Sequence, residues 1–355
     1  MDGWLRPAKA VWLWFDERTG FSKPLDTALK HPVPPETADL KRGGWIYLEG
    51  VGTLTAFIIQ VITGIALATL YIPSTANAYD SLQFITNSAT LGSVLRGMHY
   101  FGASAMVLFI GLHMLRTFLT GSFKFPRELN WLSGVVLLIV TLIMAFTGQI
   151  LRWDQDGVWS LVIAVEQAGR IPVIGTWIGR YLLAGKTFGA TTLSRMFAYH
   201  VFFFPAIIFL VVGLHLYLVL HNGISELPRS SEPVDKKTYR QRYHERLART
   251  GVPYFPDAAW HEIAFGVLMI IGIIILAAVV GPPKLGAPPD PANIQAQPRP
   301  DWYFLWYFAL LALMRPSFEN FFVILGPLVF FLVLFLIPFV AGSGQRSPIR
   351  RPWAP

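Results

Sequence analysis

The sequence contains no cysteine among its 355 residues and few charged residues, which make up 14% of the chain. Without cysteine, the chain cannot form a disulfide, bind an iron–sulfur cluster through thiolates or attach a haem covalently through a C-x-x-C-H motif. Any metal must therefore be bound by histidine, carboxylate or methionine side chains. Soluble domains usually carry about 25% charged residues, so the low charge indicates a membrane protein. The sequence shows no nucleic-acid-binding motif.

Long apolar runs recur along the chain, and a transmembrane helix needs roughly 20 apolar residues. Seven runs are candidates, and the sixth is short by itself: Leu54–Tyr71, Val94–Leu119, Trp131–Ile150, Met196–Leu220, Ile263–Val280, Tyr303–Met314 and Phe321–Val340. We expect an all-α membrane protein with about seven transmembrane helices. A bundle of four helices should be followed by a group of three.

The positions of lysine and arginine predict the orientation in the membrane. Residues 73–93 carry neither, whereas residues 222–259 carry seven, and basic loops stay in the cytoplasm. An odd number of crossings then places the N-terminus inside and the C-terminus outside. Between residues 152 and 193, two apolar stretches separated by Pro172 predict two short helices on the outer surface.

Four segments follow from these patterns. Residues 1–40 are expected to form an interfacial amphipathic segment, and residues 41–228 the four-helix bundle. Residues 229–259 form a basic cytoplasmic linker, and residues 260–345 the three-helix half.

Four of the eight histidines lie in two of the predicted membrane helices. His99 and His113 are 14 residues apart on the second helix, and His200 and His215 are 15 apart on the fourth. At 3.6 residues per turn each pair lies on one face of its helix, separated by about 21–23 Å along the axis. Because both helices cross in the same direction, His99 should meet His200 at the outer level and His113 should meet His215 at the inner level. Two bis-imidazole sites suit iron in electron transfer; a proton relay lined by histidine is the alternative.

Glycines and arginines accompany the histidines. Gly50 and Gly64, and likewise Gly134 and Gly148, repeat the separation of 14 residues. They would leave room for the edge of a haem, although glycine also serves ordinary helix packing. Arg96 and Arg116 each lie three residues from a histidine and could neutralise haem propionates, or could extend to the lipid headgroups instead.

Several segments resemble cytochrome b6 of the cytochrome b/b6 family. The most specific are RGMHYFGASAMVLFIGLHMLRTFLTG, TGQILRWDQ and LHLYLVLHNGISELP, and the separation of 15 residues in the second pair matches this branch. From PYFP onward the chain resembles subunit IV, the partner of cytochrome b6, joined here in one chain. The resemblance covers roughly residues 35 to 345.

The resemblance implies the core subunit of a quinol:cytochrome c oxidoreductase with two non-covalent b-type haems. The expected partners are a Rieske iron–sulfur protein, a c-type cytochrome, quinone and membrane lipid, in a homodimeric complex. By similarity His99 and His200 hold the low-potential haem, and His113 and His215 the high-potential one. Quinol oxidation at the outer face, electron transfer across the membrane to quinone at the inner face, and proton translocation follow from the same resemblance.

The segment from Pro300 to Phe304, PDWYF, takes the place of the family motif PEWYF at the outer quinol site. By this similarity Asp301 and Tyr303 are the candidate catalytic residues, because a carboxylate in reach of quinol can accept a proton. Alternatively, Asp301 only caps the following helix. Aspartate in place of glutamate resembles the branches that use menaquinol.

At the inner face, His221 and Glu262 are the candidates for the quinone site, because an imidazole and a carboxylate could supply its two protons. Interfacial polar residues without a ligand are the alternative.

Leu48 and Leu220 stand where the b6 branch has a cysteine and an arginine near an additional haem, so a covalent third haem is not expected. Arg152 replaces a proline of the family, and its role is open. A smaller di-haem anchor of a dehydrogenase or hydrogenase and a proton-coupled transporter are the rival functions.

Overall fold

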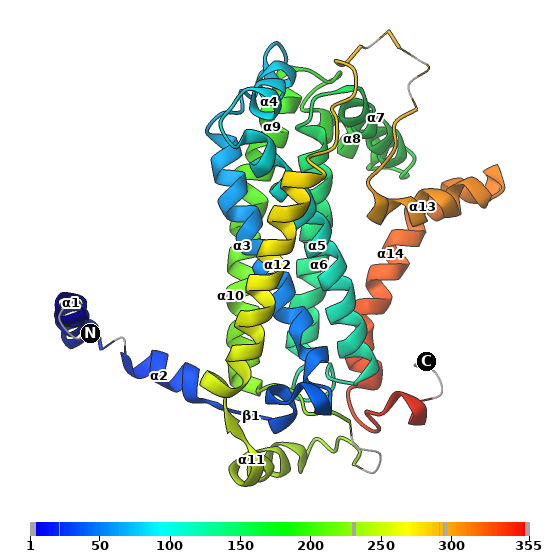
Figure 1. The fold of residues 1–355 in the computed structure, drawn as a ribbon. Helices are drawn as coiled ribbons and strands as arrows, with labels where there is room; N and C mark the ends of the chain where they lie inside the picture. Colours follow the sequence, from blue (N-terminus) through cyan, green and yellow to red (C-terminus); the bar gives the residue numbers. More distant parts are fainter. Residues whose placement is uncertain are drawn as a thin grey trace.

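The computed structural model describes residues 5–20, 22–228, 232–290, 292–293, 295 and 297–351. Within these residues the regular structure is helical except for β1 (Pro32–Val33), which pairs antiparallel with β2 (Val252–Pro253). Long helices stand side by side in an upright bundle, and shorter helices lie at both ends (Figure 1).

Six helices in the described part of the chain are long and apolar enough to cross a membrane. Their cores are α3 (Leu48–Ala68), α5 (Gly92–Leu119), α6 (Glu128–Ile150), α10 (Phe204–Asn222), α12 (Ala259–Val279) and α14 (Pro316–Ala341). α10 continues α9 (Ala190–Ala198) through a π-helical turn at Tyr199–Phe203. Large apolar side chains such as Ile58, Ile62 and Ile65 are between 49% and 65% exposed, as expected of surfaces that face lipid.

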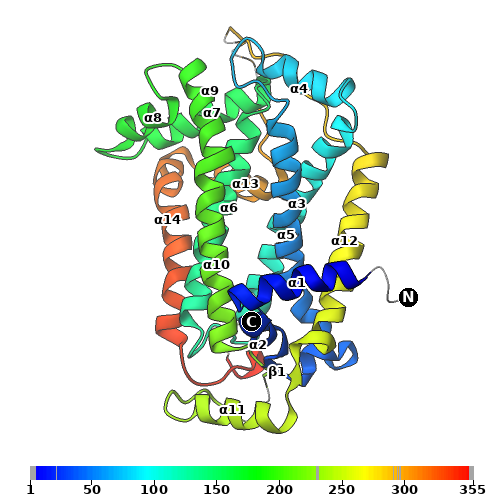
Figure 2. The ribbon, with the colours of Figure 1, turned by 90° about the vertical axis from the view of Figure 1, so that its left-hand side faces the viewer.

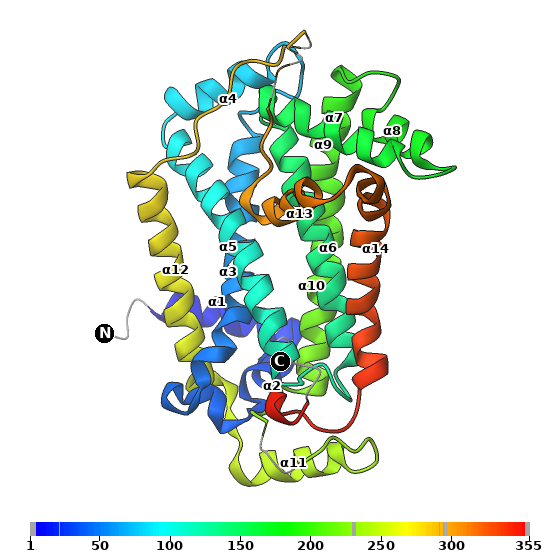
Figure 3. The ribbon, with the colours of Figure 1, turned by 90° about the vertical axis from the view of Figure 1, so that its right-hand side faces the viewer.

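The helices of the bundle form two facing pairs. α3 packs along α5, and α6 packs along α10. α12 covers the first pair, and α14 lies against α6, so these two helices flank the bundle on opposite sides (Figures 2 and 3). This arrangement leaves the inward faces of α5 and α10, which carry the histidines, opposite each other.

The seventh apolar run forms α13 (Trp302–Leu313). Twelve residues of α-helix extend about 18 Å, whereas the hydrocarbon core of a bilayer is about 30 Å thick. α13 runs across the bundle rather than along it (Figure 3). The expected all-α membrane fold is confirmed: the described residues contain six helices that are long and apolar enough to cross a membrane, and one short transverse helix.

The count of six changes the position of the C-terminal segment. Gly344 forms a backbone bridge with Val234 of the basic linker, and Arg351 donates hydrogen bonds to the carbonyls of Phe118 and Leu119 at the inner end of α5. The chain near residue 351 therefore lies on the same side as the basic linker. The expectation that the end of the chain lies on the opposite side is therefore wrong for the described residues up to 351, because α13 is too short to add a seventh crossing.

Short helices cover the two ends of the bundle. The two short helices expected around Pro172 are confirmed as α7 (Gln155–Gly169) and α8 (Gly175–Leu183), and their location on the outer side stays a prediction. α4 (Ala78–Asn87) at the outer end, and α11 (Tyr239–Thr250) in the basic linker, were not expected. α1 (Leu5–Thr19) and α2 (Ser22–Lys30) precede the bundle at the inner end (Figure 1). Short 3₁₀ turns span Pro35–Ala38, Leu40–Arg42, Gly44–Tyr47 and Pro348–Arg350, and a π-helical turn spans Tyr254–Ala258.

Candidate functional site

The four histidines of the membrane helices form two pairs between α5 and the α9–α10 helix. The ring centroids of His99 and His200 are 6.2 Å apart, and those of His113 and His215 are 6.4 Å apart. The pairing level by level that the sequence predicts is thus the arrangement in the structure.

The spacing within each pair fits one metal ion between two imidazoles. A metal–imidazole bond is about 2 Å long, so two rings bound on opposite sides of one ion have centroids about 6 Å apart. Among the described residues no group of three or more His, Cys, Asp or Glu side chains could hold a metal ion. Each pair therefore suits a metal whose remaining ligands come from a macrocycle, as in haem.

Each of the four glycines faces one histidine. A Cβ atom on Gly64 would lie 3.2 Å from the ring of His99, and one on Gly50 would lie 3.5 Å from that of His113. On the other side of the bundle the distances are 2.6 Å from Gly148 to His200 and 3.7 Å from Gly134 to His215. The glycines thus let α3 and α6 approach the imidazole edges, which is a more specific role than general helix packing.

Three of the histidines are anchored by hydroxyl groups that sequence analysis missed. The hydroxyl of Thr63 donates to the carbonyl of Ile59 at 2.6 Å, so it must accept the Nδ1–H of His99 at 2.9 Å. Ser133 holds Nδ1 of His215 in the same way at 2.8 Å, and Thr147 holds Nδ1 of His200 at 3.1 Å.

These bonds fix the tautomer of each ring. With the proton on Nδ1, Nε2 is left as the lone-pair donor toward the partner histidine, the arrangement that metal-binding imidazoles need. The signal in the sequence was a serine or threonine directly before three of the four glycines.

His200 lies in the π-helical turn at Tyr199–Phe203. A π turn takes up one residue more than an α turn. This extra residue explains how a separation of 15 residues between His200 and His215 matches the separation of 14 on α5.

The two arginines expected near haem propionates have protein partners. Arg96 donates to the hydroxyl of Thr86 at 3.0 Å and to the carbonyl of Pro283 at 2.8 Å. Arg116 forms a 2.7 Å ion pair with Glu49. Neither guanidinium extends to the membrane surface as an unattached charge.

Asp301 and Tyr303 contact each other at the start of α13. Asp301 occupies the N-cap position, but its side chain makes no capping hydrogen bond; Oδ2 instead accepts from the hydroxyl of Tyr303 at 2.8 Å. Burial, followed by the nearby carboxylate, raises the pKa of Tyr303. The phenol therefore stays protonated and donates. The geometry does not support a role for Asp301 as a helix cap alone.

The segment before α13 is held on the outer face by the junction of α6 and α7. Asp154 is fully buried and accepts the backbone N–H groups of Gly157 and Gly286, both at 2.9 Å. Arg152, whose role the sequence left open, donates to the same carboxylate. Arg152 thereby compensates the buried negative charge of Asp154, whose carboxylate binds the backbone of the loop at Gly286.

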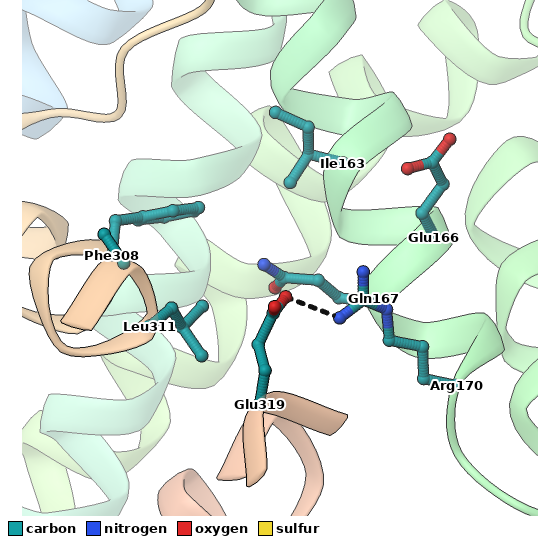
Figure 4. A pocket seen from close by; sticks show the side chains of 8 residues that line it. Ile163, Glu166, Gln167, Arg170, Phe308, Leu311 and Glu319 are labelled. Atoms are coloured by element: carbon teal, nitrogen blue, oxygen red, sulfur yellow. Dashed lines mark hydrogen bonds and ion pairs between the residues drawn. The ribbon is translucent and has the colours of Figure 1, made fainter. Parts of the chain in front are cut away.

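A cavity of about 310 Å³ lies at the other end of α13 (Figure 4). Ile163 and Gln167 of α7, with Arg170 directly after its end, face Phe308 and Leu311 of α13 across the cavity. A 2.7 Å ion pair between Arg170 and Glu319 joins α7 to the start of α14. Asp301 and Tyr303, at the start of α13, do not line this cavity.

The two inner-face candidates are on different sides of the bundle. His221 is exposed at the end of α10 and stacks on Tyr217 at a centroid distance of 5.9 Å. Glu262 lies on α12, where its carboxylate accepts from the hydroxyl of Tyr254 at 2.6 Å. α10 packs on α6, whereas α12 packs on α3 and α5. Among the described residues, no hydrogen bond, ion pair or ring contact joins His221 to Glu262.

These features define a helical integral membrane protein with two stacked bis-histidine sites inside its bundle. The family model "Cytochrome b/b6/petB" matches residues 41–223, just over half of the chain, and the chain belongs to the cytochrome b/b6 family. Members of this family bind b-type haems.

Relatives and a solved structure agree with this assignment. The chain is 39% identical to cytochrome b6 of Heliobacterium mobile over 60% of this chain and 98% of the relative. It is 36% identical to the menaquinol:cytochrome c reductase cytochrome b subunit of Bacillus subtilis (strain 168), over 61% and 97% respectively. A structure titled "Hyperthermophilic respiratory Complex III" superposes with a TM-score of 0.80 and 28% identity, covering 96% of this chain and 85% of the other.

Proposed function

We propose that this chain is the di-haem cytochrome b subunit of a Rieske/cytochrome b complex. It would oxidise quinol at the outer face and deliver electrons to quinone at the inner face, coupled to proton translocation. The catalytic unit is the assembled quinol:cytochrome c, or equivalent acceptor, oxidoreductase. The observation that carries the proposal is the two histidine pairs, with centroids 6.2 Å and 6.4 Å apart and a glycine against every ring.

The residues present fit two b-type haems. His99 and His200 would bind the outer one, and His113 and His215 the inner one. When bound, the two haems supply reversible one-electron chemistry at two depths of the membrane. Gly50, Gly64, Gly134 and Gly148 admit the macrocycles, and the anchored Nδ1 atoms hold the rings in the ligating tautomer.

Asp301 and Tyr303 would receive quinol at the outer face. Oδ2 of Asp301 already accepts a hydroxyl hydrogen bond, from Tyr303 at 2.8 Å. A quinol hydroxyl that replaced the phenol would find the same oxygen as its proton acceptor, and a group at hydrogen-bond distance is what general-base catalysis requires. Tyr303, released, remains a donor that can hold the second quinol oxygen.

At the inner face His221 and Glu262 remain candidates for proton delivery to quinone, each acting from its own side of the bundle. Arg96 and Arg116 remain candidates for contacts with the haem propionates. Each would use guanidinium N–H groups that do not already donate to Thr86, Pro283 or Glu49.

The membrane and partners follow from the relatives. We expect an energy-transducing inner membrane, with the N-terminus and basic linker in the cytoplasm, and a homodimeric complex with a Rieske protein and a c-type cytochrome. Menaquinone is the expected quinone for two reasons. Aspartate at position 301, in place of the glutamate of the family motif, resembles the branches that use menaquinol, and the relative from Bacillus subtilis is named a menaquinol:cytochrome c reductase subunit.

Haem analysis of the purified chain tests the proposal directly. A pyridine haemochrome assay should find two b-type haems per polypeptide, all extractable into acidified acetone because the chain has no cysteine. A reduced-minus-oxidised spectrum without a b-type signal would favour a transporter with a histidine relay. A haem-stained band at 39.8 kDa on a denaturing gel would show a covalent haem and contradict the assignment.

A further inference from the structure

The fourth glycine differs from the other three in the residue that precedes it. At three sites this residue is a serine or threonine whose hydroxyl accepts the Nδ1–H of the facing histidine: Thr63 with His99, Ser133 with His215 and Thr147 with His200. At the site of Gly50 and His113, the preceding residue is Glu49. A carboxylate thus occupies the place where the other sites have a neutral hydroxyl.

Glu49 and His113 each have an unused buried atom. Oε2 of Glu49 and Nδ1 of His113 are both buried without a hydrogen-bond partner. A Cβ atom on Gly50 would lie 3.5 Å from Nδ1 of His113, so this edge of the ring faces α3 next to Glu49. A buried carboxylate oxygen and a buried N–H group each lose free energy when they stay unpaired.

The other carboxylate oxygen of Glu49 is engaged by Arg116. Oε1 accepts from Nε of Arg116 at 2.7 Å, and the two side chains are only 8% and 16% exposed. Arg116 also lies over the ring of Tyr47, at 5.0 Å from its centroid. Because Arg116 follows His113 by one helical turn, it directs the carboxylate of Glu49 toward the level of His113.

We propose that Glu49 is a positioning residue for the inner site, where its second carboxylate oxygen accepts the Nδ1–H of His113. This inference rests on the proposed binding of haem by His113 and His215. The result is a chain of contacts from Arg116 through Glu49 and His113 to the metal. The other three ligands have only neutral acceptors.

A carboxylate on Nδ1 makes an imidazole a stronger electron donor than a hydroxyl does. A stronger donor stabilises the oxidised metal and lowers the reduction potential of the inner haem. Glu49 would thereby lower the reduction potential of the inner, high-potential haem. The difference between the inner and outer haem potentials would then be smaller than it would be if all four histidines had neutral acceptors.

Redox titration of the purified complex, with Glu49→Thr and Glu49→Leu, tests this role. Glu49→Thr recreates the hydroxyl of the other three sites, and Glu49→Leu removes the acceptor. We expect the inner potential to rise in Glu49→Thr and to rise further in Glu49→Leu. The total change should be about tenfold in the reduced-to-oxidised ratio, or about 59 mV for one electron. The outer haem should not shift.

Electron paramagnetic resonance of the oxidised complex supplies an independent readout, because the g values of a low-spin ferric haem respond to the donor strength of its ligands. The inner signal should change stepwise in the same order. If Glu49 only neutralises Arg116, the two variants shift the potential equally and leave the g values unchanged, which overturns the proposal.

Two controls complete the test. Thr63→Val removes the acceptor of His99 and should affect only the outer haem. If Glu49→Leu does not assemble, Glu49→Gln keeps a neutral oxygen acceptor and should match Glu49→Thr. A count of two haems with an unmoved inner potential refutes the role of Glu49 and leaves the proposed function intact, whereas a missing inner haem in the unmodified protein refutes both.

Discussion

The outer and inner histidine pairs have nearly the same geometry but different surroundings. Their centroid distances differ by only 0.2 Å, from 6.2 to 6.4 Å. At the outer level both rings are anchored by threonine hydroxyls, and Gly148 is pressed against His200. At the inner level only His215 has a hydroxyl anchor, and His113 lies near a buried ion pair. The two sites thus share the same kind of ligand and the same spacing, and they differ in the side chains that contact the histidine rings.

Removing a histidine gives the largest expected effect and tests the comparison most directly. His99→Ala or His200→Ala should abolish the outer b-haem, and His113→Ala or His215→Ala the inner one, because a bis-imidazole site needs both ligands. Absorbance spectra during redox titration would distinguish the two haems that we propose. If His99→Ala and His200→Ala removed spectrally different haems, the assignment by level would be wrong.

Asp301→Asn tests whether the carboxylate of Asp301 accepts a proton from quinol at the outer site. Quinol oxidation should slow by roughly 10²–10⁴-fold, the usual contribution of a general base, while both haems remain. Steady-state turnover of the complex measures the effect, with Asp290→Asn in the same outer loop as the control. Turnover near that of the unmodified protein at every pH would leave Asp301 with a structural role only.

Gly148→Ala and Gly134→Ala form a matched pair that sharpens the difference in packing. A methyl group on Gly148 would lie 2.6 Å from an anchored imidazole, whereas one on Gly134 would lie at 3.7 Å. Overpacking costs about 1–3 kcal/mol, so Gly148→Ala should weaken retention of the outer haem by roughly 5- to 150-fold. Gly134→Ala should change the inner haem little. Haem content after detergent washing measures both, and equal losses would contradict the prediction.

The smallest expected effect concerns an exposed ion pair. Arg170 and Glu319 are 38% and 35% exposed, and such pairs contribute about 0–1 kcal/mol. Arg170→Gln should therefore leave the thermal midpoint of the complex and both haem spectra almost unchanged. A loss of the outer haem in this variant would show that this exposed ion pair, at the cavity between α7 and α13, contributes more to the outer site than its exposure indicates.

Much of the fold and of the site could be predicted from the sequence because both depend on helical periodicity. Six of the seven apolar runs overlap the long apolar helices, with ends that differ by up to eight residues. The helical period of 3.6 residues per turn then places the two histidines of each helix on one face. The separation of 14 between glycines likewise points to the histidine levels.

Other features depend on contacts between distant segments, which periodicity does not contain. α13 is as apolar as a crossing helix, but its 12 residues are too few to cross, and the structure adds that this helix lies transverse to the bundle. His221 and Glu262 are both polar residues at the inner ends of helices, yet the packing of α10 and α12 on different neighbours separates them. The partners of Arg96 and Arg116 depend on the same long-range packing.

The π-helical turn at Tyr199–Phe203 has a consequence for how this helix can change during evolution. Because such a turn absorbs one surplus residue, the loss of one codon between His200 and His215 would convert it to regular helix and leave both imidazoles in place. α5 is an unbroken α-helix from Gly92 to Leu119 and has no such reserve. One codon gained there between His99 and His113 would turn the second histidine about 100° away from its partner. We therefore expect the loss of one residue to be tolerated on the helix of His200 and His215, whereas α5 would need a new π turn to absorb a gained residue.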